Sequence, residues 1–390
     1  MKPIRVLFLT GSLNLGGTER NILHLATRLN PERFRVEVWS DYEGEPVQAE
    51  LRARGIECRA LKPGHSLGKP LLTRLLRHNL PYQWRLFRLL RANRGAVVHA
   101  FGFPMAYYAV LIGRLAGCRR IVFAVQDWDV WKRAGVYGAL DRICSRLAAR
   151  VVADGQGARR LAARRQGMAP DRLATIYDGV DVEELKPSRS PADIRRELGL
   201  EPDCVTIGMI ARLDLAKKGQ DIFLSAIPGI RAKAPRTQFV IVGDGPDRAR
   251  IEALRESLPA GARPVMAGRR TDLADMISAL DILVIPSRWE SVPKVLLEAM
   301  WLARPVVAAR VGDIPEILDD TCGALPPPDS PDALAEAVAR LAGDAELRSR
   351  IGRAAHERIR ALGLTLDHSV RAYEKLYEEL QPGEISVDIS

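Results

Sequence analysis

The stretch Asp281-Ile-Leu-Val-Ile-Pro-Ser-Arg-Trp-Glu290-Ser-Val-Pro-Lys-Val-Leu-Leu-Glu298-Ala-Met300 carries the clearest structural signal in the chain. Residues 281–285 form a β-branched apolar run closed by a Pro-Ser pair, which predicts a short buried strand. Residues 296–302 predict a helix, and Pro293 suits its first position because that position needs no N–H. The order is therefore strand, polar loop and helix N-terminus. In an open parallel sheet, ligands bind at such a place, beyond the carboxyl ends of the strands.

The start of this predicted helix offers a site for an anion. The N–H groups of Lys294 and Val295 have no partner within the helix, and phosphate is the usual ligand of such groups. Two carboxylates, Glu290 and Glu298, flank the turn with seven residues between them. Carboxylates accept hydrogen bonds from hydroxyl groups, so the pattern predicts a ligand that is part phosphate and part sugar. The alternative is a pair of surface glutamates on an amphipathic helix. The strand before the loop and the helix after it favour the ligand site.

Length and composition indicate a globular protein of two or three domains. The chain has 390 residues, of which 47% are apolar and 27% charged, and it has no low-complexity tract. Its longest apolar runs fall well short of the roughly 20 residues that a membrane span requires, and residues 6–10 are too brief for a signal-peptide core. Five cysteines stand singly without metal-ligand spacing. This predicts reduced thiols in a cytoplasm rather than a disulfide framework or a zinc site.

Charge is distributed unevenly along the chain. Residues 1–182 carry a net charge of +15, whereas the remainder carries −5, and no acidic residue stands between Glu57 and Asp127. A basic half invites an anionic partner, which could be nucleic acid, an acidic lipid surface or a phosphorylated acceptor. Nucleic acid is disfavoured because no aromatic stacking platform or recognised binding motif accompanies the charge.

The region 71–93 supports two interpretations. Arg85, Arg88 and Arg91 recur at every third position with apolar residues between them, which predicts a basic amphipathic helix. Such a helix can lie on anionic lipid. It can equally cover a sheet with its apolar stripe and leave a solvated basic face. The two interpretations apply to different faces of the helix and are compatible.

Predicted strands alternate with predicted helices throughout, which implies an α/β protein with a parallel sheet in each half. A linker at 187–191 separates the halves. The predicted strands cover 4–9, 34–40, 96–100, 121–125, 151–153, 205–210, 239–242, 265–270, 281–285 and 305–309.

Together these motifs resemble those of the family-four retaining glycosyltransferases, and the resemblance covers nearly the whole chain. Glu290 and Glu298 match the Glu-x(7)-Glu signature of that family. The resemblance implies the GT-B fold, in which two Rossmann-like parallel-sheet domains face a central cleft. It implies an acceptor-side domain over 1–182, a nucleotide-sugar-binding domain over 183–364, and a C-terminal helix at about 365–382 that packs back on the first domain.

Other segments match the donor-binding segments of the same family. Gly16 and Gly17, which let a backbone approach a ligand closely, match a Gly-Gly-x-Glu loop that faces the donor diphosphate and the acceptor. Arg212 and Lys218 match the basic pair that holds the donor pyrophosphate, although two solvated surface cations are the simpler alternative. The resemblance makes Arg212, Lys218 and Glu290 the catalytic candidates. The donor-binding candidates are Gly16, Gly17, Gly243, Asp244, Arg269, Ser291, Val292, Pro293, Lys294, Val295 and Glu298.

The acceptor side has fewer signals. Some relatives carry a histidine where this chain has Gln126 and Asp127, so the base that would deprotonate an acceptor stays open between Asp127 and His99. A lone histidine at the end of a strand is more often structural. The Asp127-Trp-Asp129 triplet looks like the metal-binding Asp-x-Asp of the other major glycosyltransferase fold. We reject that interpretation because a GT-B site uses helix N-termini and cationic side chains in place of Mg²⁺.

The expected function is retaining transfer of a sugar from a nucleotide-diphosphate donor without a metal or other cofactor. UDP-sugars are the favoured donors and GDP-mannose comes next. The expected acceptor is a glycan or a lipid-linked glycan in cell-surface polysaccharide or glycolipid synthesis, reached in the cytoplasm or at the inner face of the membrane. One alternative is a non-catalytic relative that binds a sugar nucleotide or an anionic surface. A second is a sugar-nucleotide epimerase, which can share the architecture but which the Glu-x(7)-Glu stretch disfavours.

Overall fold

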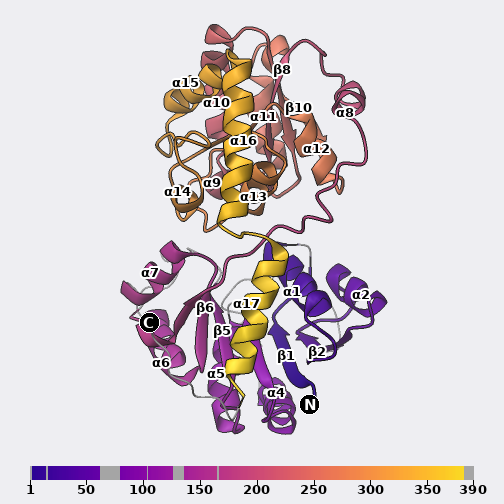
Figure 1. Ribbon diagram of the computed structural model, residues 1–390, viewed down its shortest axis with the longest axis vertical. Coiled ribbons are helices and arrows are strands. Elements are labelled where there is room, and N and C mark those ends of the chain that lie inside the picture. The colour runs from indigo at the N-terminus through magenta and orange to yellow at the C-terminus, as the bar shows by residue number, and fades with distance from the viewer. Residues whose placement is uncertain are drawn as a thin grey trace. The chain divides into compact units, whose positions relative to one another are not determined.

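The chain forms two compact units in the computed structural model, which describes residues 2–14, 16–61, 80–102, 104–125, 136–164 and 167–381 (Figure 1). The first unit consists of Met1–Tyr177 and Asp367–Ser390, and the second unit of Asp178–Leu366. The boundary expected after residue 182 lies close to this division.

The first unit contains a parallel sheet that has seven strands within the described residues, in the order β3-β2-β1-β4-β5-β6-β7. The strands are β1 (Ile4–Thr10), β2 (Phe34–Ser40), β3 (Glu57–Ala60), β4 (Val97–Phe101), β5 (Ile121–Val125), β6 (Arg150–Ala153) and β7 (Leu173–Thr175). The helices are α1 (Gly17–Arg28), α2 (Pro46–Ala53), α4 (Leu80–Ala92), α5 (Met105–Leu115), α6 (Val136–Leu147), α7 (Gln156–Arg164), the short 3₁₀ turn η2 (Pro170–Arg172), and α17 (Leu366–Glu379).

Alternating side chains of this first sheet face two different helical layers. Leu7 and Leu9 of β1 belong to the core that includes Leu86 of α4 and residues of α5. On the other face, Phe8 packs edge-on against His99 of β4, which contacts Tyr377 of α17. Both faces of the first sheet are therefore buried, as expected for parallel strands whose sequences are continuous apolar runs. Figure 1 shows α17, in yellow, lying across the strands of this unit.

The second unit contains a parallel sheet with five strands among the described residues, in the order β10-β9-β8-β11-β12. The strands are β8 (Val205–Ile210), β9 (Thr237–Val242), β10 (Val265–Gly268), β11 (Ile282–Ile285) and β12 (Val306–Ala308). The helices are α8 (Pro191–Glu197), α9 (Leu215–Lys218), α10 (Gln220–Lys233), α11 (Arg248–Glu256), the 3₁₀ turn η3 (Ala260–Ala262), α12 (Leu273–Ala279), α13 (Lys294–Trp301), α14 (Ile314–Ile317), α15 (Pro331–Ala342) and α16 (Ala345–Ala361).

The strands of the second sheet also alternate between two cores. Phe239 and Ile241 of β9 join a large core with α10, α11 and α15, whereas Val240 and Val242 join a smaller core with α8 and α12. The period of two along β9 places successive side chains on opposite faces. Helices therefore cover both faces of this sheet, which leaves the strand ends as the places where loops can form a site.

The structure resolves part of the ambiguity over the region 71–93. Helix α4 begins at Leu80, and residues 71–79 lie outside the described residues. Leu86 and Leu90 are buried against the first sheet, whereas Arg85, Arg88 and Arg91 are exposed. The apolar stripe thus covers a core and the arginines form a solvated face. No helix in the described part of the chain is long and apolar enough to cross a membrane.

Candidate functional site

The second sheet reverses its direction of growth between β8 and β11. The chain adds β9 and β10 on one side of β8, and then adds β11 and β12 on the other side. Ligands of open α/β sheets bind at such a switch point, outside the carboxyl ends of the strands. Arg212 follows the end of β8, Gly243 and Asp244 follow β9, Arg269 follows β10 and Glu290 follows β11. The donor-side candidates of this unit thus follow the carboxyl ends of the strands.

The loops on the two sides of the switch point meet through Lys218 and Glu290. The Lys218 ammonium Nζ lies 2.5 Å from Glu290 Oε1. The buried Ser287 hydroxyl donates a second hydrogen bond to the same oxygen, at 2.8 Å. Glu290 is only 5% exposed, so its charge is offset by the ammonium and the hydroxyl rather than by bulk water. This arrangement fixes one cation and one carboxylate at the switch point.

The loop that carries Arg212 and Lys218 is also held by the turn that follows β9. The N–H of Leu213 donates to the carbonyl of Asp244 at 3.1 Å, and the N–H of Leu215 donates to the Asp247 carboxylate at 2.9 Å. Gly243 has φ +140°, and a Cβ there would lie 1.9 Å from the carbonyl oxygen of Ala211. Glycine is therefore required at 243 for the two loops to approach this closely.

A second close approach holds the backbone of Glu290. Gly312, in the loop after β12, has φ +58°, and a Cβ there would lie 1.8 Å from the carbonyl oxygen of Glu290. The N–H of the next residue, Asp313, donates to the carbonyl of Ser291 at 3.3 Å. Strand β11 lies between β8 and β12 in the sheet. The loop after β12 thus supports the Glu290 loop from one side, whereas Lys218, which follows β8, contacts it from the other.

Helix α13 begins one residue later than the position of Pro293 suggested. Pro293 is the N-cap, with extended backbone angles, and Lys294 is the first helical residue. The N–H of Leu296 donates to the carbonyl of Pro293 at 3.0 Å. The N–H groups before it in the first turn have no intrahelical partner, as at any helix start. Glu298 is half-buried in the turn of α13 that follows.

The remaining donor-side candidates are solvent-accessible. Arg212, Asp244 and Arg269 are exposed, whereas Ser291 and Val292 are partly buried. Within the described part of the chain, no hydrogen bond or ion pair joins Arg212 or Arg269 to Glu290. The structure therefore brings Lys218 and Glu290 together and leaves the two arginines free to meet a ligand.

The glycine loop of the first unit is anchored by a residue that the sequence did not reveal. Gly16 is the N-cap of α1, and Gly17 begins that helix, about four residues earlier than expected. The buried Glu45 carboxylate accepts hydrogen bonds from the Leu13 N–H, and from Ser12 and Asn14 at 2.9 Å each. Glu45 lies outside any periodic pattern, so only the folded loop shows its role.

His99 lies in the core of the first unit rather than on its surface. It is fully buried, and its Nδ1 lies 2.7 Å from the Tyr377 hydroxyl of α17. Burial lowers its pKa to about 3. This placement favours the structural interpretation over that of an acceptor-side base. The other candidate, Asp127, lies outside the described residues together with Gln126 and Asp129.

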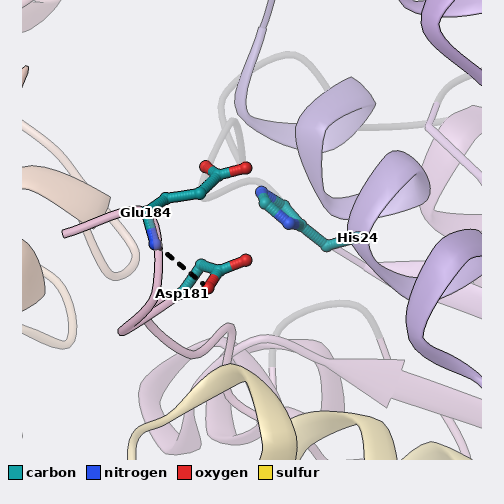
Figure 2. Close-up of side chains that lie close together, drawn as sticks. All are labelled: His24, Asp181 and Glu184. Atoms are coloured by element: carbon teal, nitrogen blue, oxygen red, sulfur yellow. Dashed lines mark hydrogen bonds between the residues drawn. The ribbon is translucent and has the colours of Figure 1, made fainter. Parts of the chain in front are cut away.

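Residues 181–184, near the start of the second unit, form a well-defined turn. The Asp181 carboxylate accepts hydrogen bonds from the N–H groups of Glu183 at 3.1 Å and Glu184 at 3.4 Å, the second of which is drawn in Figure 2. A Cβ on Gly179 would lie 2.1 Å from the carbonyl carbon of Thr365. Glycine thus allows the two ends of the second unit to run side by side.

Two models of protein families match the chain. The model described as Glycosyltransferase Family 4 matches residues 15–184, and the model described as Glycosyl transferases group 1 matches residues 204–344.

Curated relatives match over part of their length. A D-inositol 3-phosphate glycosyltransferase of Saccharomonospora viridis is 33% identical over 203 residues, which are 48% of this chain and 46% of the relative. An alpha-D-kanosaminyltransferase of Streptomyces kanamyceticus is 34% identical over 165 residues, or 41% of this chain and 42% of the relative. The Escherichia coli UDP-Gal:alpha-D-GlcNAc-diphosphoundecaprenol alpha-1,3-galactosyltransferase is 25% identical over 58% of this chain and 60% of its own length. The chain thus spans about half the length of the curated relatives it matches.

Solved structures share the architecture along nearly the whole chain. HepE of Anabaena in complex with UDP has a TM-score of 0.81 and 20% identity, and covers 96% of this chain and all of its own. WaaG, a glycosyltransferase involved in lipopolysaccharide biosynthesis, has a TM-score of 0.73 and 18% identity over 97% of this chain and all of its own. These likenesses establish the GT-B fold. The two family models and the curated relatives show that the chain belongs to the family-four glycosyltransferases.

Proposed function

We propose that the chain transfers a sugar, with retention of anomeric configuration, from a nucleotide-diphosphate donor to a glycan or lipid-linked acceptor. The observation that carries the proposal is the Lys218–Glu290 contact at the switch point of the second sheet, next to the N-terminus of α13. A cation, a carboxylate and free helix N–H groups in one place suit a ligand that combines diphosphate with sugar hydroxyls.

Lys218, Arg212 and the first N–H groups of α13 would stabilise the leaving diphosphate. Negative charge grows on the leaving oxygen as the glycosidic bond breaks, and donors already fixed in place stabilise that charge without reorganising. An ammonium has three N–H donors, so Lys218 can hold Glu290 and still donate to a phosphate oxygen. These cationic groups supply the role that Mg²⁺ has elsewhere, and we propose that the reaction needs no metal.

The two glutamates would hold the donor at its sugar and nucleoside ends. By their match to the family signature, Glu298 would accept hydrogen bonds from the ribose hydroxyls and Glu290 from the donor sugar. The leaving phosphate itself would help to deprotonate the acceptor hydroxyl on the same face of the sugar, which yields retention.

A UDP-sugar is the donor we favour, and GDP-mannose is the next choice. HepE of Anabaena binds UDP and UDP-glucose, and the Escherichia coli relative is named for a UDP-Gal donor. The same relative is named for a lipid-linked acceptor.

The exposed arginine face of α4 would place such an enzyme at an anionic membrane surface. Co-sedimentation with phosphatidylglycerol vesicles should exceed that with neutral vesicles, and equal co-sedimentation with both would overturn this last point.

The test is nucleotide release from UDP-, GDP- and ADP-sugars with EDTA present, for the wild type and for Glu298→Ala. Exposed Glu336 of the same unit provides the matched control, Glu336→Ala. We expect release from one donor that survives EDTA, collapses in Glu298→Ala and persists in the control. Loss of release on adding EDTA would refute metal independence.

Two other outcomes would replace the proposal. An isomeric nucleotide sugar formed without any acceptor would identify an epimerase. Binding of a sugar nucleotide by calorimetry, with no turnover across an acceptor panel, would identify a binding protein. Retention itself is read from the anomeric configuration of the product by NMR, and an inverted product would overturn it.

A further inference from the structure

The guanidinium of Arg288 lies at the centre of a set of contacts within the second unit. It makes a two-pronged contact with the Asp221 carboxylate, through Nη1 at 3.1 Å and Nη2 at 2.7 Å. Nη1 also donates to the carbonyl of Leu215 at 2.6 Å, and Nε donates to the Asp329 carboxylate at 2.7 Å. One side chain therefore links α10, the short helix α9 and the segment before α15.

The backbone of Arg288 adds a further link to the same place. Its N–H donates to the carbonyl of Lys217 at 2.9 Å, immediately before Lys218. Next to this link, a Cβ on Gly219 would lie 2.3 Å from the carbonyl oxygen of Pro286, so the loops that follow β8 and β11 are in close backbone contact. Arg288 thus stands two residues before Glu290 and binds the residues that precede Lys218.

We propose that Arg288 is a positioning residue that fixes the loop bearing Lys218 against the loop bearing Glu290. This inference rests on the proposed function, in which these two side chains meet the donor. A lysine side chain has four rotatable bonds, so the place of its ammonium depends on where its backbone is held. Arg288 holds that backbone from the Glu290 side, while Asp247 holds it from the other side through Leu215.

Arginine is the one side chain that can make all of these contacts together. Its planar fork binds a carboxylate with two parallel N–H groups and still has Nε for another acceptor, whereas lysine offers a single point charge. Burial tends to raise the pKa of Asp221, but the hydrogen bond and charge of Arg288, together with hydrogen bonds from backbone N–H groups, lower that pKa overall. Asp221 thus stays charged in the range where the enzyme would work.

The test compares Arg288→Met with a matched arginine elsewhere in the same unit. Arg195 also donates to a carbonyl, that of Ala279 at 2.9 Å, and to a carboxylate, that of Asp281 at 2.9 Å. Its side chain is 19% exposed against 25% for Arg288, but it binds near the amino ends of β8 and β11, away from the site. Arg195→Met therefore controls for loss of an arginine that only stabilises the fold.

Two readouts separate positioning from mere stabilisation. With the donor that the wild type turns over, we expect Arg288→Met to lower kcat on the order of 10- to 100-fold, and Arg195→Met to leave kcat within about two-fold. Hydrogen exchange followed by mass spectrometry should show faster exchange over residues 212–220 in Arg288→Met and no change there in Arg195→Met. Arg288→Lys, which keeps the charge and the fold but not the fork, should fall between the wild type and Arg288→Met in both readouts.

The two readouts also distinguish the failure of this inference from the failure of the proposed function. If the wild type turns over no donor, the exchange experiment still tests whether Arg288 fixes the loop. Exchange over 212–220 that is unchanged in both Arg288 variants would overturn the inference. Equal losses of kcat in Arg288→Met and Arg195→Met would overturn it as well, because they would mark a general loss of structure.

Discussion

Lys218 and Glu290 stand 72 residues apart in the chain, yet their charged groups are in contact. Their side chains are 22% and 7% exposed, so the pair is largely removed from water. Removing the cation from such a pair leaves a buried carboxylate without its counter-charge, which is costly. The carboxylate, rather than the lysine, is therefore the group whose environment the fold must maintain.

We predict that Lys218→Met lowers kcat by about 10²- to 10³-fold, because a fixed donor to the leaving group is lost. Unfolding free energy should also fall by about 1–3 kcal/mol, since Glu290 keeps only the Ser287 hydrogen bond. Turnover assays and chemical denaturation measure the two effects. The control is Lys233→Met, an exposed lysine of α10 that pairs with Glu336, which should change neither quantity appreciably.

A second prediction at this scale concerns His99 and pH. Its pKa in the folded chain is about 3, below the ordinary value of about 6.5, so the unfolded chain binds a proton that the folded chain excludes. Stability from this group is therefore complete above pH 6.5 and is lost as the pH falls towards 3. At pH 5 the loss relative to high pH should be about 2 kcal/mol.

Denaturation of the first unit at these pH values measures the effect. His99→Gln should lack this part of the pH dependence, and His368→Gln, at an exposed position of α17, should keep it. Equal pH dependence in the wild type and His99→Gln would contradict the assignment.

Among single residues, the sequence predicted the positions of those that belong to a motif. Glu290, Glu298 and Lys218 stand at fixed spacings on recognisable strand–loop–helix patterns, so their places were predictable. Ser287 and Glu45 were not, because a hydroxyl or carboxylate in a loop gains its partner only from the loop's conformation.

The elements that build the site are joined by close backbone contacts as well as by side chains. Helix α13 starts next to the Glu290 loop, and the loop after β12 reaches that loop through Gly312. The sequence predicted the strands of the second unit, though not β3 and β7 of the first, and it predicted the order strand, loop and helix, because apolar runs and helix caps are local signals. A close backbone contact between two loops that follow different strands is not indicated by the local sequence, except by the glycine that permits it.

We predict that Gly312→Ala destabilises the second unit and lowers turnover. The added Cβ would collide with the Glu290 carbonyl oxygen, and alanine is strained at φ +58°. Gly199→Ala is the matched control, because Gly199 has φ +66° but open space around its Cα. The control should lose about 1 kcal/mol of stability from strain alone and keep its kcat. Similar kcat values in the two variants would show that the loop after β12 does not support Glu290.

At the scale of the whole molecule, the chain divides into two units that each have their own sheet and core. The family resemblance implied this division, and the change in net charge accompanies it. The sequence alone did not fix the boundaries to the residue, because the first division, after Tyr177, falls in an irregular segment, and the second, after Leu366, falls at the start of α17.

We predict that a fragment spanning 178–366 folds and binds UDP without the first unit. All of the residues assigned to the nucleotide in this unit follow strands of its own sheet. Saturation to 100 times the dissociation constant should stabilise the fragment by about 2.7 kcal/mol, which calorimetry with and without UDP measures. Glu298→Ala in the same fragment is the control and should lose the stabilisation. A fragment that folds but ignores UDP would show that the first unit is required for nucleotide binding.

Helix α17 is encoded at the end of the chain but packs in the first unit, against His99 and Phe34. A ribosome that adds about 5–20 residues per second reaches it only some 10 to 40 s after completing residue 177. Throughout that interval the nascent first unit displays the aromatic face that α17 will cover, while the second unit can already form its own sheet. The first unit therefore cannot complete its core until α17 has been synthesised, although it is the first of the two units to be translated.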